Sequence, residues 1–201
     1  IGYKKAFKYA SDSTNKYRLM NNLANTYLST GDLKKAIQAN KLSIDYFNKT
    51  NNGAFLSYAF QSKASILRKQ QNYAAIDLMR KVIRLRKQHS PKQLGSAYQR
   101  MAETFKKFNM LDSAIVYQQK AILADSLKTE DYRAFLNIQL AKYHILNKQP
   151  KQAQPYLKKA QGLQKRPLTE AIGCHTLALY YSKTGQQAAA LAEFARCDSL
   201  L

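Results

Sequence analysis

The sequence is poor in several residue types that mark other classes of protein. Its 201 residues include two cysteines, seven glycines, four prolines and no tryptophan. Two cysteines in a chain of this length do not make a disulfide framework, so cytoplasm and periplasm both stay open as compartments. No run of about 18 apolar residues occurs and the mean hydropathy is −0.50, so we expect no transmembrane segment.

Acidic residues are also few, at 12 against 33 lysines and arginines, which gives a net charge of +21. This balance favours anionic partners, but because the cations are scattered rather than massed, a solvated helical surface is the preferred interpretation. We find no paired carboxylates for acid–base chemistry and no glycine-rich phosphate loop. None of the three histidines has a second metal-binding residue at helical spacing. We therefore expect no enzyme, no metal site and no cofactor.

The chain does contain an internal repeat. A small residue, a bulky residue three positions later and a second small residue 11 or 12 positions after the first recur five times. The first members are spaced by 40, 38, 39 and 37 residues, which is the signature of a repeat architecture. The five sets are Ala24, Tyr27 and Ala36; Ala64, Leu67 and Ala75; Ala102, Phe105 and Ala114; Ala141, His144 and Ala153; Ala178, Tyr181 and Ala190.

Each set lies in a helical pattern. Around the first set, apolar or small residues fall close to a period of 3.6, and Gly31 and Asp32 separate two such runs. A glycine permits the positive φ that ends a helix, and an aspartate can cap the next one. The small residues allow two helix axes to approach within about 8–10 Å. No segment alternates as a strand would, so the sequence predicts an all-α chain of antiparallel helix pairs.

The segment LANTYLSTGDLKKAI resembles the tetratricopeptide repeat (TPR). LALYYSKTGQQAAALAEFARC and MAETFKKFNMLDSAIVYQQKAIL resemble it nearly as well. The usual period of that family is about 34 residues, whereas the spacing here is longer. The extra residues follow the second helix of each unit. In this respect the chain is similar to the long-repeat regions found beside output modules of bacterial regulators.

The resemblance implies a right-handed α-solenoid of antiparallel helix pairs, a TPR-like superhelix. We expect a single array over residues 1–201, with a partial unit 1–16 and units of about 17–56, 57–94, 95–133, 134–170 and 171–201. Because the chain starts without methionine and stops inside a helical run, we also expect it to be a piece of a longer protein.

The resemblance further implies that the first helices line a concave groove. Amides and cations in the early units suit a peptide backbone and carboxylates, while the late units offer apolar groups; ordinary solvated surface is the alternative. A clamp for a C-terminal carboxylate is not expected, because Glu103 would repel it. The candidate groove residues are Arg18, Asn21, Asn25, Tyr58, Gln61, Arg68, Gln99, Lys106, Lys142 and His175.

A second candidate surface is a basic run on the second helix of the second unit, which the resemblance places on the outer face. This polyanion patch lacks the stacking aromatics or groove-entering helix that nucleic-acid recognition uses. Its members are Arg80, Lys81, Arg84, Arg86 and Lys87.

We therefore expect a non-catalytic scaffold that binds a protein or peptide, as the recognition or sensor region of a larger bacterial protein. The alternative is a basic scaffold that binds nucleic acid or another polyanion through its outer face. Cys174 and Cys197 fall in the two helices of the last unit. Small core thiols are favoured there over a disulfide, and both interpretations stay open.

Overall fold

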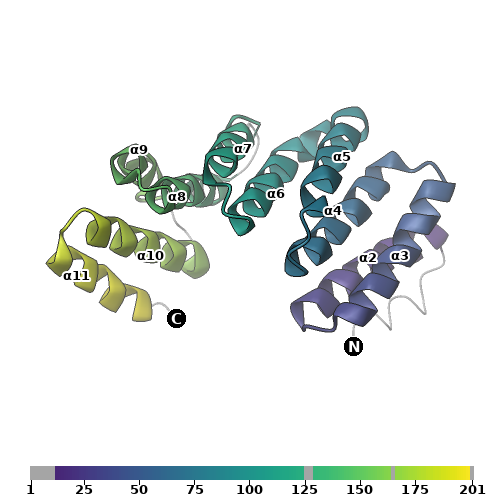
Figure 1. Ribbon diagram of the computed structural model, residues 1–201, viewed down its shortest axis with the longest axis horizontal. Helices are drawn as coiled ribbons and strands as arrows, with labels where there is room; N and C mark the ends of the chain where they lie inside the picture. The colour runs from purple at the N-terminus through teal and green to yellow at the C-terminus, as the bar shows by residue number, and fades with distance from the viewer. Residues whose placement is uncertain (1–11, 125–128, 164–165, 200–201) are drawn as a thin grey trace. The chain divides into compact units, whose positions relative to one another are not determined.

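The computed structural model describes residues 12–124, 129–163 and 166–199, and within these ranges it is helical, with no strand (Figure 1). The expected all-α class is thus confirmed. The helices are α2 (Ser13–Ser29), α3 (Leu33–Lys49), α4 (Gly53–Lys69), α5 (Ala74–His89), the 3-10 turn η1 (Pro91–Gln93), α6 (Leu94–Lys107), α7 (Leu111–Leu123), α8 (Glu130–Leu146), α9 (Pro150–Ala160), α10 (Pro167–Lys183) and α11 (Gln187–Asp198).

The helices form two compact bodies, which we describe separately. The N-terminal body ends at Phe108 and contains α2 to α6, and the C-terminal body begins at Asn109 and contains α7 to α11. In the first, α2 pairs with α3 and α4 with α5, and α6 packs on α5. In the second, α7 packs on α8, while α8 pairs with α9 and α10 with α11. Each body therefore consists of consecutively packed helices. The division into repeat units stays a prediction, and its partial first unit lies outside the described residues up to position 11.

The repeated alanines, which the sequence predicts to lie at helix crossings, are buried. All ten of them are between 0% and 3% exposed. A side chain larger than a methyl group at such a crossing would force the helix axes apart or out of register, at a cost of about 1–3 kcal/mol. The small residues of the sequence pattern are thus buried, and their role as contact points of helix pairs stays a prediction.

The turn inside each helix pair is also repeated. One residue in each of these turns has a positive φ, between 56° and 87°. Asp32 follows the first of these turns and caps α3, because its carboxylate accepts a hydrogen bond from the Lys35 amide at 3.1 Å. The positive-φ residues lie seven positions after the first alanine of each set, at Gly31, Gln71, Asn109, Lys148 and Gly185.

Candidate functional site

The first helices of the N-terminal body lie beside one another, since α4 contacts both α2 and α6. By helical spacing, five of the candidate residues share one side of these helices, which we call the binding face: Arg18, Asn25, Gln61, Arg68 and Lys106. Arg18, Asn25 and Lys106 are exposed, whereas Gln61 and Arg68 are half-buried. Two further candidates, Asn21 and Gln99, are buried beneath this face.

A hollow of about 320 Å³ opens between α2 and α4. It brings together three of the candidates, Arg18, Asn21 and Tyr58, with Asn22 and two phenylalanines, Phe47 and Phe55. We call it the ring hollow, because rings supply most of its apolar wall. The Phe47 and Phe55 centroids are 5.3 Å apart, and Phe55 and Tyr58 are 6.5 Å apart.

A relay of amides fixes the orientation of Asn21. The Asn40 Nδ2 group donates to the Ala59 carbonyl oxygen at 2.8 Å and to Asn21 Oδ1 at 3.2 Å. Because the Ala59 carbonyl oxygen can only accept a hydrogen bond, the Asn40 atom that faces it must be the Nδ2 donor. The same Nδ2 group also donates to Asn21, so the Asn21 atom that faces it must be the oxygen Oδ1. The Asn21 Nδ2 group makes no hydrogen bond with the described part of the chain, although the residue is only 7% exposed. Asn21 therefore lines the ring hollow, and its Nδ2 group is available to donate a hydrogen bond to a ligand.

Arg86 departs from its predicted place. The sequence predicts Arg86 among the outer cations, but the side chain is 1% exposed. Its guanidinium donates to Gln61 Oε1 at 2.8 Å, to Ser96 Oγ at 2.9 Å and to the Gln93 carbonyl at 3.1 Å. It also lies over the Tyr58 ring, 4.8 Å from the centroid. The correction has a physical reason: this side of α5 faces α4 and the start of α6, so the side chain is covered by the helices on which it packs.

Burial has an electrostatic consequence for Arg86. Its bonded partners are neutral, and burial lowers the pKa of the guanidinium, while the Tyr58 contact opposes the shift and Arg100 adds to it. Its Nε atom finds no hydrogen-bond partner among the residues that the structure describes. Burying a guanidinium without a carboxylate partner costs free energy. The three hydrogen bonds that Arg86 donates and its contact with the Tyr58 ring offset part of that cost.

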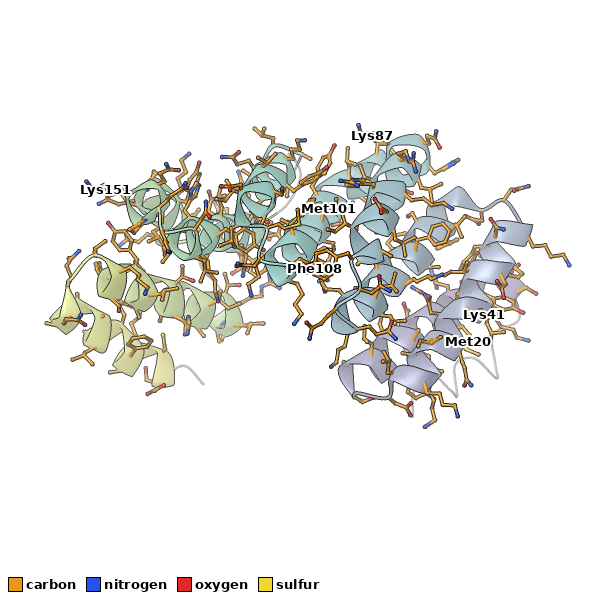
Figure 2. All side chains as sticks on the ribbon, in the orientation of Figure 1. Met20, Lys41, Lys87, Met101, Phe108 and Lys151 are labelled. Carbon is orange, nitrogen blue, oxygen red and sulfur yellow. The ribbon has the colours of Figure 1, made fainter. Side chains whose placement is uncertain are left out.

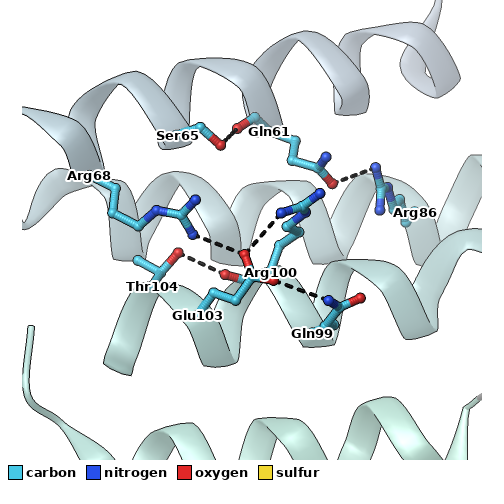
Figure 3. A network of polar contacts seen from close by, with 8 residues as sticks. All are labelled: Gln61, Ser65, Arg68, Arg86, Gln99, Arg100, Glu103 and Thr104. Carbon is cyan, nitrogen blue, oxygen red and sulfur yellow. Dashed lines mark hydrogen bonds and ion pairs between the residues drawn. The ribbon is translucent and has the colours of Figure 1, made fainter. Parts of the chain in front are cut away.

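Glu103 is the centre of a second polar cluster, between α4 and α6 (Figure 3). One of its carboxylate oxygens accepts from Arg100 Nη1 at 2.9 Å and from Arg68 Nη1 at 3.3 Å, and the other accepts from Gln99 Nε2 at 3.0 Å. The carboxylate expected to repel ligands is therefore compensated by two guanidinium groups. With Arg86 nearby, the cluster retains a net positive charge.

The C-terminal body carries the other two groove candidates. Lys142 on α8 is half-buried. His175 on α10 is exposed and meets the Phe194 ring of α11 edge-on, with centroids 6.1 Å apart. A larger cavity of about 610 Å³ lies among α9, α10 and α11, with Glu170, Arg196 and Tyr181 among its lining residues. Arg196 spans Glu170 and Glu193 there, at 2.9 and 3.4 Å. The positive charge of Arg196 is thus neutralised by two glutamates of the same body.

The remaining cations of the polyanion patch are exposed, but two of them are engaged. Arg80 pairs with Asp77 at 2.6 Å, and the Lys81 ammonium lies 4.4 Å from the Phe60 ring centroid. Arg84 and Lys87 face solvent, and Figure 2 shows Lys87 at the edge of α5, pointing away from the helices. The patch therefore offers fewer free cations than its sequence suggests.

The two cysteines are free thiols and both are buried. Burial, together with the neighbouring Cys174 thiol, raises the pKa of Cys197 to about 12. A thiol with so high a pKa is a poor nucleophile at neutral pH. Within the described ranges no group of histidine, cysteine and acidic side chains is placed to hold a metal ion. No helix in those ranges is both long and apolar enough to cross a membrane.

Sequence reasoning missed five residues of the face and of the ring hollow, among them Phe47 on α3. Arg100, Asn22 and Phe55 stand on the first helices, and Asn40 acts from α3. Arg100 carried a usable signal, because it precedes Glu103 by three positions on a helix, where opposite charges meet. Asn40 carried none, since its role depends on a carbonyl 19 residues away.

Stacked helix pairs with small residues at the crossings define a helical-repeat protein. The family model of the tetratricopeptide repeat matches residues 17–49, which confirms the resemblance found in the sequence for this segment. A comparison with curated proteins finds no match.

Solved structures show the same fold for the whole chain. A putative kinesin light chain with TPR-like repeats from Podosopora anserina is 16% identical, with a TM-score of 0.77 and coverage of 95% of this chain and 97% of that one. BtubC (BKLC) from P. vanneervenii is 15% identical, with a TM-score of 0.78 and coverage of 100% and 91%. YrrB, a TPR protein with an unusual peptide-binding site, is 15% identical, with a TM-score of 0.57 and coverage of 100% and 92%. Similarity at these identities establishes the fold alone.

Proposed function

We propose that this chain is a non-catalytic scaffold whose binding face holds an extended peptide segment of a partner protein. The observation that carries the proposal is the pairing of a ring-walled hollow with exposed cations and amides on the same helices. Apolar walls supply affinity, and a few fixed polar groups supply orientation. Extended segments suit this surface because their backbone carbonyls can accept from its amides.

The charge of the chain supports an acidic partner segment. The chain has a net charge of +21, and the acid on the face, Glu103, is already bound by Arg68 and Arg100. Complementary charge raises the rate of encounter and disfavours basic competitors. We therefore propose a segment rich in aspartate or glutamate as the ligand.

The role within a larger protein is proposed from the fold. A signal transduction ATPase from Pyrococcus horikoshii, PH0952, contains a tetratricopeptide repeat sensor; this chain is 15% identical to it and covers 35% of it, with a TM-score of 0.64. Peptide binding by YrrB provides a second precedent for the fold. On the fold, and on the resemblance of the sequence to repeat regions of bacterial regulators, we propose that the chain is the recognition or sensor region of a larger bacterial protein.

Selection from a displayed peptide library tests the proposal. The chain is expected to enrich acidic segments, whose affinities are then measured by fluorescence polarisation for two matched variants. Lys106→Glu reverses a charge on the binding face, and Lys87→Glu reverses the same charge on the outer side of α5. Both lysines are exposed, so neither change should disturb folding.

The two variants give opposite expected outcomes. Lys106→Glu should weaken binding of the selected acidic peptides by about tenfold, because a favourable charge becomes repulsive, while Lys87→Glu should leave it within about twofold. Equal effects of the two variants would argue against the binding face. Enrichment of no peptide at all would argue against the peptide-binding function.

A further inference from the structure

The aromatic wall of the ring hollow is held in place by contacts between neighbouring rings. Its wall belongs to a continuous row of rings: Tyr17 stacks on Tyr46 at 4.1 Å, and Tyr46 meets Phe47 edge-on at 5.4 Å. The row continues through Phe55 to Tyr58. Contacts of this kind hold each ring in place, so the wall does not depend on a ligand for its shape.

Arg86 holds the last ring of this row. Its guanidinium lies over Tyr58, and hydrogen bonds from three different segments fix the guanidinium in turn. The residue does not line the hollow itself. It acts as a positioning residue, because a cation on a ring face restrains the ring without occupying the space in front of it.

The rim of the hollow is polar and lacks an acid among its lining residues. Arg18 is exposed and makes no ion pair with any described residue. Asn21 presents its Nδ2 group, because Asn40 holds the other end of the amide. A guest in the hollow thus meets apolar rings inside, an amide donor beside it and a free cation at the entrance.

We propose that the ring hollow is the anchor site of the binding face, and that it takes one bulky apolar side chain of a partner peptide with an acidic residue next to it. This proposal rests on the proposed function and names the ligand class for it. The rings enclose the side chain, Asn21 Nδ2 donates to a peptide carbonyl, and Arg18 binds the carboxylate. A volume of about 320 Å³ is near the lower end of pockets that hold small ligands, and suits a single aromatic side chain.

A set of synthetic peptides tests the anchor. The parent is a fluorescein-labelled nonapeptide with a central phenylalanine between two aspartates, flanked by glycine and serine. One relative replaces the phenylalanine with alanine, and another replaces both aspartates with asparagine. Affinities are measured by fluorescence polarisation at about 50 mM and 150 mM salt, since charge contributions shrink as salt rises.

Removing the phenylalanine should weaken binding at least about tenfold at both salt concentrations, because burial of such a side chain is worth that factor or more. Replacing the aspartates should weaken binding mainly at the lower salt. Arg18→Gln should abolish the preference for aspartate over asparagine and keep the preference for phenylalanine over alanine. Arg84→Gln, an exposed arginine on α5, is the matched control and should change neither preference.

Two results would overturn the anchor. Equal affinities for the phenylalanine and alanine peptides would show that the hollow holds no side chain, and an aspartate preference that survives Arg18→Gln would show that the carboxylate binds elsewhere. If library-selected peptides still respond to Lys106→Glu in either case, the anchor fails while the proposed function stands. If they do not respond, both fail together.

Discussion

At the residue scale, Arg84 and Arg86 show how the same side chain takes opposite roles two positions apart. Both belong to one basic run, yet Arg84 is exposed and Arg86 is buried. Residues two apart on a helix point about 200° apart, so a run of this kind cannot put all its members on one face. Arg86 ends beneath the binding face, where it contacts Gln61 and Tyr58.

Arg86→Ala should destabilise the protein strongly. The change removes three hydrogen bonds and leaves a cavity, so we expect the free energy of unfolding to fall by about 2–4 kcal/mol. Arg84→Ala, the matched control, should cost less than about 0.5 kcal/mol. Urea unfolding followed by circular dichroism measures both values. Equal losses for the two variants would contradict the assigned environment of Arg86.

The same pair marks the limit of prediction at this scale. The sequence placed the binding-face cations Arg18 and Lys106 on exposed positions, as the structure has them. Arg86 was misplaced because helical periodicity gives the angle between side chains but not which neighbours will cover them. Its partners come from α4 and from the start of α6, and only the packed fold brings these together.

At the scale of the helix pair, the turn position is fixed while its residue varies. Gly31 and Gly185 occupy it in two pairs, but Gln71 and Lys148 hold the same left-handed conformation in two others. A side chain with a Cβ atom adopts this conformation at a cost that glycine avoids. The sequence showed these turns where glycine was present, and was less clear where the left-handed residue was glutamine or lysine.

Replacing the non-glycine turn residues should therefore stabilise the protein. Gln71→Gly and Lys148→Gly are each expected to raise the free energy of unfolding by about 0.5–1 kcal/mol, because relief of the positive φ exceeds the added entropy of the unfolded chain. Lys87→Gly, inside an exposed helix, should instead lower it by about 1 kcal/mol. Thermal and urea unfolding compare the three variants, and a loss of stability at either turn would contradict the account.

Asp131 joins two helices of the C-terminal body. It is 5% exposed, and its carboxylate accepts from the Arg166 amide and the Thr169 hydroxyl, each at 3.1 Å, and from Arg166 Nε at 2.5 Å. One side chain of α8 thereby caps the start of α10. The bond spans 35 residues, which explains why no local sequence signal revealed it.

Removing this cap should loosen the start of α10. Asp131→Ala should lower the free energy of unfolding by about 1–3 kcal/mol, less than a fully buried pair would lose because Arg166 is largely exposed. Hydrogen exchange should accelerate first in the amides of the opening turn of α10. Exchange in that turn at the rate of the parent protein would show that Asp131 does not stabilise the start of α10.

At the scale of the whole molecule, the net charge of +21 allows two modes of binding, to a peptide or to a polyanion. The two modes differ in how the affinity depends on salt concentration. A binding face with one anchor and a few cations should keep much of its affinity as salt rises, since the apolar part is not screened. Binding that rests on phosphates alone should decay steeply with salt. The outer side of α5 offers few free cations for such binding, because Arg80 is paired and Arg86 is buried.

Random-sequence DNA should therefore bind only weakly. We expect measurable binding at about 50 mM salt and its loss near 150 mM, because a scattered set of cations makes few simultaneous phosphate contacts. Fluorescence anisotropy of a labelled duplex over a salt titration measures this. Retained submicromolar affinity at the higher salt would favour the polyanion alternative over the peptide-binding function.

The central claim is that the partner segment lies on the binding face of α2, α4 and α6. A photocrosslinking amino acid in place of Asn25, on that face, or of Arg84, on the outer side of α5, tests it most directly, since both positions are exposed. With a peptide selected from the library, we expect an ultraviolet-induced crosslink from position 25 and none from position 84. A crosslink from position 84 alone would contradict the account.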